Sequence, residues 1–309
     1  MAIPTSRTVE KGDIHIDDSK CTGCGTCAIV CKDGSLEIKE QKAVASDNAL
    51  FGCIACGHCM AVCPHGAIEI SGRTLDPAHV FDLGRSEKIA DYGQLLGLLQ
   101  RRRSMRDFLE KEVPTEIVNQ ILEAAATAPM GIPPSDVGVL VLQGAKANAD
   151  FADNFAELVN SQKWIFSGPM LFLMRPFIAK TDYQMLKNFA GPAFREIVKK
   201  IQDGKNMLTY SAPLSMYFYG SPYTDTADPI IAATLAMCAG ESLGLGTCCI
   251  GLVHPMLQNG KEAAKFREKY GIKHKSKSGI MVIFGYRAIQ FQKGIKRSFA
   301  SVTFRNGGF

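Results

Sequence analysis

The chain has 309 residues, of which 46% are apolar and 21% are charged, and its formal net charge at pH 7 is +5. These proportions are those of an ordinary globular protein, and so modest a charge without a clustered basic face predicts no nucleic-acid partner. Residues 1–17 contain no apolar run, so we expect no signal peptide. Eleven cysteines in such a chain are typical of the reducing cytoplasm, where we expect the protein to reside.

Eight of the cysteines lie in two copies of one pattern, Cys21-x2-Cys24-x2-Cys27-x3-Cys31 and Cys53-x2-Cys56-x2-Cys59-x3-Cys63. Thiolates at this spacing hold a cubane of iron and sulfide, and the fourth cysteine of each run ligates the other cluster. We therefore expect one [4Fe-4S] cluster on Cys21, Cys24, Cys27 and Cys63, and a second on Cys53, Cys56, Cys59 and Cys31. Structural zinc is the alternative, but zinc sites normally separate their cysteine pairs by about a dozen residues or more.

The two runs are halves of an internal repeat, since CTGCGTCAIVCKDGSLEI aligns on CIACGHCMAVCPHGAIEI without a gap. The apolar alternations Leu36, Ile38 and Ile68, Ile70 predict a short strand after each cysteine run. Residues 1–75 resemble a bacterial-type ferredoxin with two clusters. The first run departs from that pattern, because Lys32 stands where the second run has Pro64.

Glycines, one proline and mixed charges between Ser71 and Asp91 predict a domain boundary, with a linker over residues 76–90 and a second domain over residues 91–309. In that domain one helix begins near Asp91, and Pro114 opens another that ends before Ala128-Pro129. The expected strands are Val137–Leu142, Met170–Met174, Leu214–Tyr219, Cys248–Val253 and Ile280–Tyr286. The expected helices between them are Tyr183–Ile201, Asp228–Leu243 and Gly260–Tyr270. This alternation alone favours a parallel sheet.

The longest apolar stretch, Ile230 to Val253, approaches the length of a membrane span. Glu241 and four glycines interrupt it. The stretch therefore predicts a buried helix, a turn and a strand, and no membrane partner.

A dense basic cluster, Arg101-Arg102-Arg103-Ser104-Met105-Arg106, follows the first of these helices. Guanidinium groups bind phosphate oxygens in pairs, and a neighbouring serine hydroxyl adds a donor, so the cluster favours a phosphate-bearing cofactor. A solvated basic surface that suits the helix dipole is the alternative.

Further motifs follow in order: Arg102-x-Ser104-x-Arg106-x-Phe108, Ala124-Ala125-x-x-Ala128-Pro129, Leu243-Gly244-Leu245-Gly246-Thr247-Cys248-x-Ile250-Gly251 and a basic segment Lys293 to Arg297. In this order they resemble the FMN-dependent nitroreductase family, and the whole chain resembles its ferredoxin-fused members. The resemblance implies an α+β protein in which a small two-cluster ferredoxin-like domain precedes a nitroreductase-like FMN-binding α+β domain. It also implies an antiparallel-rich sheet, a homodimer with FMN in the subunit interface, and a C-terminal arm that reaches across to the partner.

The resemblance assigns the flavin phosphate, ribityl chain and pyrimidine edge to Arg102, Ser104 and Arg106, with Arg297 returning to the phosphate. The remaining flavin-binding candidates are Arg103, Met130, Gly131, Ile132, Pro133, Pro134, Ser135, Leu245, Gly246, Thr247 and Lys296. Two departures from the family are visible. Residues 130–135 replace its usual asparagine and Gln-Pro-Trp stretch, and Gly285-Tyr286-Arg287 replaces its Gly-Tyr-Pro.

Functionally, the resemblance implies an FMN-dependent oxidoreductase with no separate catalytic residue, since the flavin carries the chemistry. We expect a low-potential donor, ferredoxin or similar, to supply electrons through two [4Fe-4S] clusters to FMN, with NAD(P)H as the other possible electron donor. A nitro compound, a quinone or another small molecule would accept them. The alternatives are an electron-transfer subunit of a larger redox partner and a redox sensor. We expect Cys238, Cys248 and Cys249 to pack in the core and not to form a redox pair.

Overall fold

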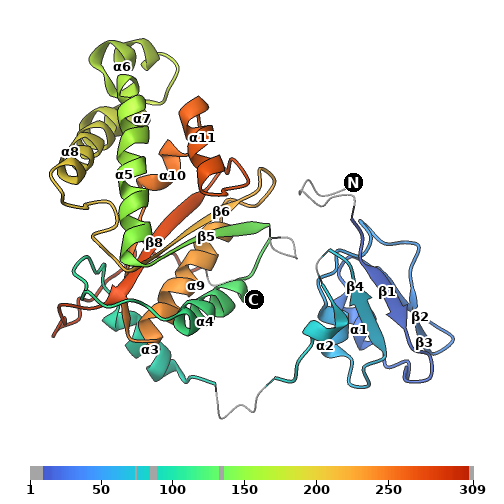
Figure 1. The fold of residues 1–309 in the computed structure, drawn as a ribbon. Helices are drawn as coiled ribbons and strands as arrows, with labels where there is room; N and C mark the ends of the chain where they lie inside the picture. Colours follow the sequence, from blue (N-terminus) through green and yellow to red (C-terminus); the bar gives the residue numbers. More distant parts are fainter. Residues whose placement is uncertain (1–9, 74, 84–88, 132–135, 306–309) are drawn as a thin grey trace.

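The computed structural model describes residues 10–73, 75–83, 89–131 and 136–305. In its N-terminal part, β1 (Asp13–Ile16) pairs antiparallel with β4 (Ile68–Ser71), and β2 (Leu36–Lys39) pairs antiparallel with β3 (Lys42–Ala45). Two short helices, α1 (Thr26–Val30) and α2 (His58–Val62), pack against one another (Figure 1). The predicted strands after the two cysteine runs are confirmed as β2 and β4.

The internal repeat is visible in the backbone of these two helices. Gly25 immediately precedes α1 with φ of 78°, and Gly57 immediately precedes α2 with φ of 75°. A side chain with a Cβ rarely adopts this left-handed conformation without strain, so both copies use glycine to turn the cysteine loop into its helix.

A short 3-10 helix, η1 (Pro77–His79), follows the first part of the chain, and α3 (Tyr92–Arg101) opens the second. The carboxylate of Asp91 accepts the backbone N–H of Gln94, and the Gln94 side chain accepts the N–H of Asp91. This reciprocal cap fixes the start of α3 at the predicted residue.

The C-terminal part is built around one sheet in the order β5 (Val137–Gln143), β6 (Leu214–Gly220), β8 (Gly279–Tyr286) and β7 (Leu245–Ile250). All three strand pairs are antiparallel. The resemblance therefore predicts the sheet correctly, and the simple alternation of elements does not.

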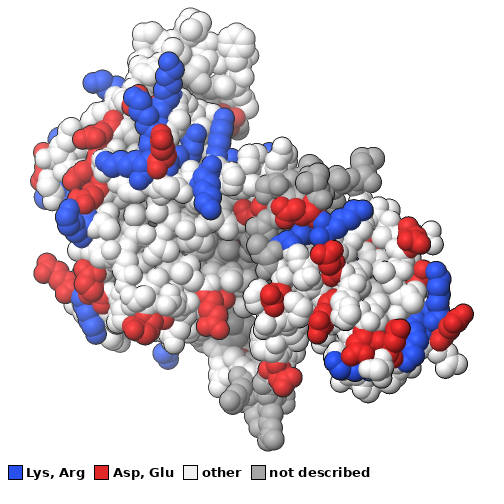
Figure 2. Space-filling model, turned by 45° about the vertical axis from the view of Figure 1, so that its right-hand side comes forward, with Lys and Arg blue, Asp and Glu red and all other residues white. Residues whose placement is uncertain are grey.

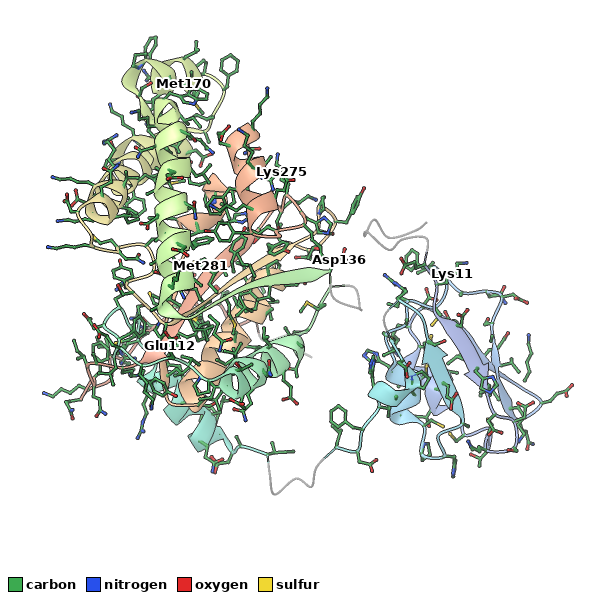
Figure 3. The ribbon with its side chains drawn as sticks, viewed as in Figure 1. Lys11, Glu112, Asp136, Met170, Lys275 and Met281 are labelled. Atoms are coloured by element: carbon green, nitrogen blue, oxygen red, sulfur yellow. The ribbon has the colours of Figure 1, made fainter. Side chains whose placement is uncertain are left out.

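Helices cover both faces of this sheet, which explains its apolar strands. On one face lie α5 (Ala145–Ser161), α8 (Gly191–Gln202), α10 (Val253–Met256) and α11 (Lys261–Lys269). On the other lie α4 (Thr115–Ala126) and α9 (Asp228–Ser242). Neighbouring residues of β6 face opposite layers: Tyr217 joins the α5 side and Phe218 the α9 side. In Figure 3, Met281 of β8 lies within this sandwich.

The apolar stretch Ile230 to Val253 is divided as predicted, because α9 ends at Ser242 and β7 begins at Leu245. Among the described residues no helix is both long and apolar enough to cross a bilayer. On the face that Figure 2 shows, side chains of both charge signs are interspersed.

The predicted strand Met170–Met174 is wrong. These residues belong to α6 (Gly168–Met174), which follows η3 (Lys163–Phe166) and carries a proline in its first turn. A five-residue apolar run has no reliable period, and the proline favours the start of a helix. Phe172 and Leu173 are exposed there. Figure 3 shows Met170 at the end of the molecule that α6 forms.

Other predicted elements are found with small differences. The strand predicted over Cys248–Val253 is β7, displaced toward Leu245 because Val253 already belongs to α10. The helix predicted over Tyr183–Ile201 is a continuous run of α7 (Lys180–Met185), the π-helical η4 (Leu186–Ala190) and α8. Helix α5 falls where no element is predicted.

Candidate functional site

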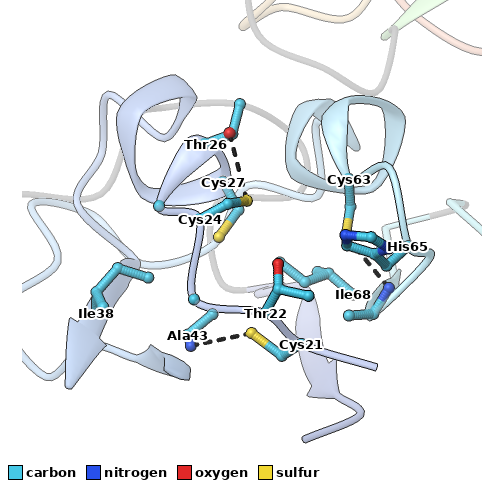
Figure 4. A pocket seen from close by; sticks show the side chains of 13 residues that line it. Cys21, Thr22, Cys24, Thr26, Cys27, Ile38, Ala43, Cys63, His65 and Ile68 are labelled. Atoms are coloured by element: carbon cyan, nitrogen blue, oxygen red, sulfur yellow. Dashed lines mark hydrogen bonds between the residues drawn. The ribbon is translucent and has the colours of Figure 1, made fainter. Parts of the chain in front are cut away.

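The eight cysteines of the two runs line two separate cavities. Cys21, Cys24, Cys27 and Cys63 line the first, and Cys31, Cys53, Cys56 and Cys59 line the second. Figure 4 shows Cys63 reaching the first cavity from the end of α2, whereas its three partners lie in and before α1. Each cavity therefore takes three thiols from one run and one from the other, and each set of four expected from the spacing is brought together.

The short helices explain this exchange. Cys27 lies in α1 and Cys59 in α2, and both are buried. The fourth cysteine of each run comes after its helix has ended, where Cys31 has ψ of 90° and Cys63 has ψ of 111°. The extended backbone redirects each chain at that point, and the packing of α1 on α2 places the fourth thiol beside the other run.

Backbone amides and one hydroxyl surround the sulfurs of the first cavity (Figure 4). The N–H of Ala43 donates to Cys21 Sγ at 3.4 Å, and the N–H of Ala67 donates to Cys63 Sγ at 3.3 Å. Thr26 Oγ1 lies 3.5 Å from Cys24 Sγ. Donors of this kind stabilise a thiolate and tune the reduction potential of a cluster that it ligates.

The surroundings shift the thiol pKa values in both directions. Hydrogen bonding to Thr26 lowers the pKa of Cys24. Burial raises the pKa of Cys27 and Cys53, and burial with the neighbouring Cys53 raises that of Cys59 to about 12. A buried thiol of this kind stays protonated at neutral pH until a cation replaces its proton, so metal binding here releases protons.

Among the described residues, no three Cys, His, Asp or Glu side chains converge as the ligands of a single metal ion. A cubane distributes its four thiolates over four irons and so needs a wider set of ligands than a mononuclear site. The two sets of four thiols suit this chemistry, with mostly apolar or small residues around them in the first cavity.

The basic cluster after α3 forms an extended segment beside the start of β7. Ser104 forms a parallel bridge with Thr247, and the N–H of Met105 donates to the Thr247 carbonyl at 2.9 Å. Met105 is buried, so the alternating Arg102, Ser104 and Arg106 lie on the opposite, more open side of the segment. Among the described residues no carboxylate forms a salt bridge with Arg102 or Arg106.

The neighbouring arginine has a structural use. The Arg103 guanidinium donates to the carbonyls of Gln100 and Arg102 at 2.8 and 2.6 Å, which caps the end of α3. Gly294 of the C-terminal segment lies beside Arg103, and the exposed Lys296 and Arg297 follow two and three residues later.

None of the flavin-binding candidates Leu245, Gly246 and Thr247 has an exposed side chain. Leu245 and Thr247 are fully buried, and the Thr247 hydroxyl donates to Glu241 Oε1 at 2.8 Å. A Cβ on Gly246 would lie 2.7 Å from Met105 Cγ and 2.8 Å from Arg287 Cγ. Glycine at this position therefore lets the segment of Met105 pack on β7.

Replacing Gly246 with alanine should lower the free energy of unfolding by about 1–3 kcal/mol, because its Cβ overpacks two neighbouring side chains. Gly251→Ala is the matched control, since no atom lies within 4 Å of its Cβ and its φ is not in the left-handed range. Chemical denaturation followed by the fluorescence of Trp164, the single tryptophan, measures both variants. Equal stability of the two would contradict the packing role of Gly246.

Glu241 interrupts an apolar stretch of the sequence, and in the structure it contacts Thr247 of β7. Its side chain is 2% exposed and forms an ion pair with the Arg287 guanidinium, while its other oxygen accepts the Thr247 hydroxyl. Arg287 stands where the family pattern has proline, and a lone carboxylate in a buried helix needs a partner. The arginine in place of proline and the carboxylate in an apolar helix were together the sequence signal for this ion pair.

Met130 and Gly131 lie at the other end of the sheet. Gly131 donates its N–H to Asp228 Oδ1 at 3.1 Å, and the following strand β5 begins where Val137 pairs with Gly220. The candidates Ile132, Pro133, Pro134 and Ser135 lie outside the described residues.

The strand register shows that the two groups of flavin-binding candidates, those near Arg102 and those near Met130, lie far apart within one chain. Gln143, the last residue of β5, pairs with Leu214, which pairs with Phe284, and next to Phe284 the start of β7 pairs with β8. Thus Arg102–Arg106 and Leu245–Thr247 lie at one end of the sheet, and Met130 lies at the opposite end and beside the opposite edge strand. Seven residues of β5 alone account for about 20 Å of that separation. Asp136 and Glu112 mark the two ends in Figure 3.

Residues 99–286 match the model of the nitroreductase family. The chain belongs to the nitroreductase family. Residues 13–64 of this nitroreductase-family chain match the model of a 4Fe-4S dicluster domain, so the ferredoxin-type part precedes the nitroreductase part as the sequence predicts.

Solved structures and one curated protein are similar to this chain. A crystal structure of a nitroreductase with bound FMN from Bacteroides fragilis NCTC 9343 is 20% identical and aligns with a TM-score of 0.50, over 69% of this chain and 99% of that one. It supports the α+β fold. A nitroreductase with bound FMN from Desulfitobacterium hafniense DCB-2 is 19% identical over 69% of this chain and 98% of that one, with a TM-score of 0.47.

An FMN reductase [NAD(P)H] of Bacillus subtilis (strain 168) is 29% identical over 160 residues. These residues are 52% of this chain and 55% of that protein. The chain thus spans about half the length of this curated relative.

Proposed function

We propose that this chain is an FMN-dependent iron–sulfur oxidoreductase. In this proposal, electrons from a low-potential donor such as reduced ferredoxin pass through two [4Fe-4S] clusters to FMN and on to a nitro compound, quinone or other small acceptor, whereas NAD(P)H would reduce FMN directly. The observation that carries the proposal is the sorting of eight cysteines into two four-thiol cavities within a nitroreductase-family chain. Clusters carry single electrons, whereas FMN exchanges one or two, so a chain holding both joins one-electron carriers to organic substrates.

The chemistry of Arg102, Ser104 and Arg106 suits the flavin phosphate and its neighbouring groups. Their side chains share one face of the extended segment, and no described carboxylate neutralises either guanidinium. Gly294 lies beside Arg103, and two more cations, Lys296 and Arg297, follow it two and three residues later. A dianionic phosphate is a natural partner for such a group of donors.

We propose in addition that the protein is a homodimer whose flavin site combines both groups of candidates. Within one chain Arg102 and Met130 lie at opposite ends of the sheet, and a two-fold axis would let one group from each subunit meet. The described part of the segment after β8 has no helix or strand and carries exposed large apolar side chains. These are Ile289, Phe291, Ile295, Phe299, Val302 and Phe304. Both features favour the role of this segment as an arm that contacts a partner subunit.

Anaerobically purified protein tests the proposed activity directly. We expect steady reduction of a nitroaromatic or a quinone when reduced ferredoxin or NAD(P)H is supplied. Bound FMN without any turnover of such acceptors would contradict the proposal and favour an electron-transfer subunit of a larger partner.

Replacing Arg102 with alanine should raise the Kd for FMN at least about 10-fold, because a charged hydrogen bond contributes roughly 1.5–3 kcal/mol. Arg101→Ala is the matched control, since Arg101 is the exposed last residue of α3 and is no flavin candidate. Fluorescence titration of the flavin-free protein with FMN measures both variants. An unchanged Kd in Arg102→Ala would remove this arginine from the site.

A further inference from the structure

The second cavity differs from the first in the residues that line it. All residues that line the first cavity lie between Cys21 and Ile68. The second cavity is lined by residues between Ile14 and Ile70 and, in addition, by Met130 of the nitroreductase part. It has a volume of about 300 Å³ against about 20 Å³ for the first. Among the described residues that line the second cavity, Met130 is thus the one that comes from the nitroreductase part.

Met130 is held in place from its other side. It is half-buried against the apolar layer that α4 and α9 form beneath the sheet. The next residue, Gly131, donates its N–H to the buried carboxylate of Asp228 in the first turn of α9. A carboxylate at a helix N-terminus is stabilised by the helix dipole, so this anchor fixes the main chain directly after Met130.

Met130 and Gly131 also belong to the stretch that the family resemblance assigns to the flavin. One short segment therefore combines a contact with the second cavity and a position in the proposed flavin site. Electron transfer between two centres falls steeply with the distance between them, so the set of thiols nearest to that segment has the advantage as the donor to FMN.

The thiols of the first cavity instead suit the entry of electrons from an external donor. Cys24 is exposed, and the neighbouring Ile29 on α1 is 68% exposed. A protein donor docking on this face would approach the first set of thiols, whereas Met130 is among the residues that line the second cavity.

We infer that electrons move through this chain in a fixed order, entering at Cys21, Cys24, Cys27 and Cys63 and leaving for FMN from Cys31, Cys53, Cys56 and Cys59 at the Met130 contact. This inference rests on the proposed function. Each passage oxidises one equivalent of a one-electron donor such as reduced ferredoxin. Two passages deliver the two electrons that full reduction of FMN needs, and solvent supplies the protons. Met130 is a positioning residue, because it holds the second cavity against the flavin-binding part.

Hydrogen–deuterium exchange tests the contact without any need for turnover. Replacing Met130 with glutamate should speed amide exchange over residues 53–59 and 31–36, because a charge would separate the two surfaces. Exchange over residues 21–27 should stay unchanged. Met130→Leu, which preserves an apolar side chain of similar size, should retain the exchange of the unsubstituted chain. Met185→Ala controls for loss of an exposed methionine elsewhere. Equal exchange in Met130→Glu and the unsubstituted chain would overturn the contact.

Anaerobic stopped-flow mixing with reduced bacterial ferredoxin tests the order. In Met130→Glu, bleaching of the clusters should keep its rate while bleaching of FMN slows at least tenfold, and Met130→Leu should restore the FMN rate. In Cys31→Ala with Cys53→Ala, the remaining cluster should still be reduced but FMN should not. FMN reduction at the unsubstituted rate in either the glutamate or the double-cysteine variant would overturn the proposed order. A protein with no cluster or flavin absorbance before mixing would instead contradict the proposed function itself.

Discussion

Replacing Cys31 and Cys53 together with alanine should halve the iron content, from about eight to about four atoms per chain, because both thiols line the second cavity. Replacing Cys53 and Cys63 together removes the same number of thiols but affects both cavities, so little iron should remain. The two double variants differ only in which fourth cysteine is lost. Their comparison therefore reports how the ligands are shared between the runs.

Iron and sulfide assays on anaerobically purified protein, with electron paramagnetic resonance of the reduced samples, measure this difference. Cys238→Ala is the control, since Cys238 lies in α9 and lines neither cavity. The reverse result, with about four irons left after loss of Cys53 and Cys63, would show that each run ligates its own cluster. Zinc in place of iron would reject the clusters altogether.

The grouping of the cysteines was predictable because it depends on local spacing. Three thiols within seven residues must converge, and a fourth that follows a one-turn helix is carried away from them. The same run occurs twice, so each copy supplies the ligand that the other lacks. The two cavities of the structure have this composition.

The flavin candidates were predictable in part. The resemblance assigned Arg102, Ser104 and Arg106 to the flavin, and in the structure they alternate along one extended segment. The resemblance could not show that Arg103 turns back to cap α3, or that Gly246 is required by Met105 and Arg287. Both depend on contacts between segments that are distant in sequence.

The separation of Met130 from the arginines could not be predicted from periodicity either. Strand order and register decide it, and the alternation of elements favoured a parallel sheet that the structure does not contain. The misread α6 has a similar cause. Its apolar residues suggested a strand, whereas Phe172 and Leu173 are exposed on a helix.

Removing one partner of the Glu241–Arg287 pair should lower the free energy of unfolding of the nitroreductase part by about 3 kcal/mol. Loss of either partner leaves a charge in a buried or half-buried position, and such losses cost roughly 3–5 kcal/mol in proteins. The lower end applies because the Arg287 side chain is 29% exposed. For a domain of roughly this size, the Tm should fall by about 6–12 °C. Trp164 fluorescence reports unfolding of this part alone, since no other tryptophan is present.

A double-mutant cycle separates the pair from the packing of its members. Glu241→Leu and Arg287→Met should each be costly, but the variant with both substitutions should be less destabilised than the sum of the two, because it buries no unpaired charge. Glu241→Gln should retain the acceptor for the Thr247 hydroxyl and still leave Arg287 without its counter-charge. Strictly additive losses would mean that the two side chains stabilise the fold independently. In that case the arginine that replaces the family's proline would contribute by packing on Gly246 and Phe108, and not by its charge.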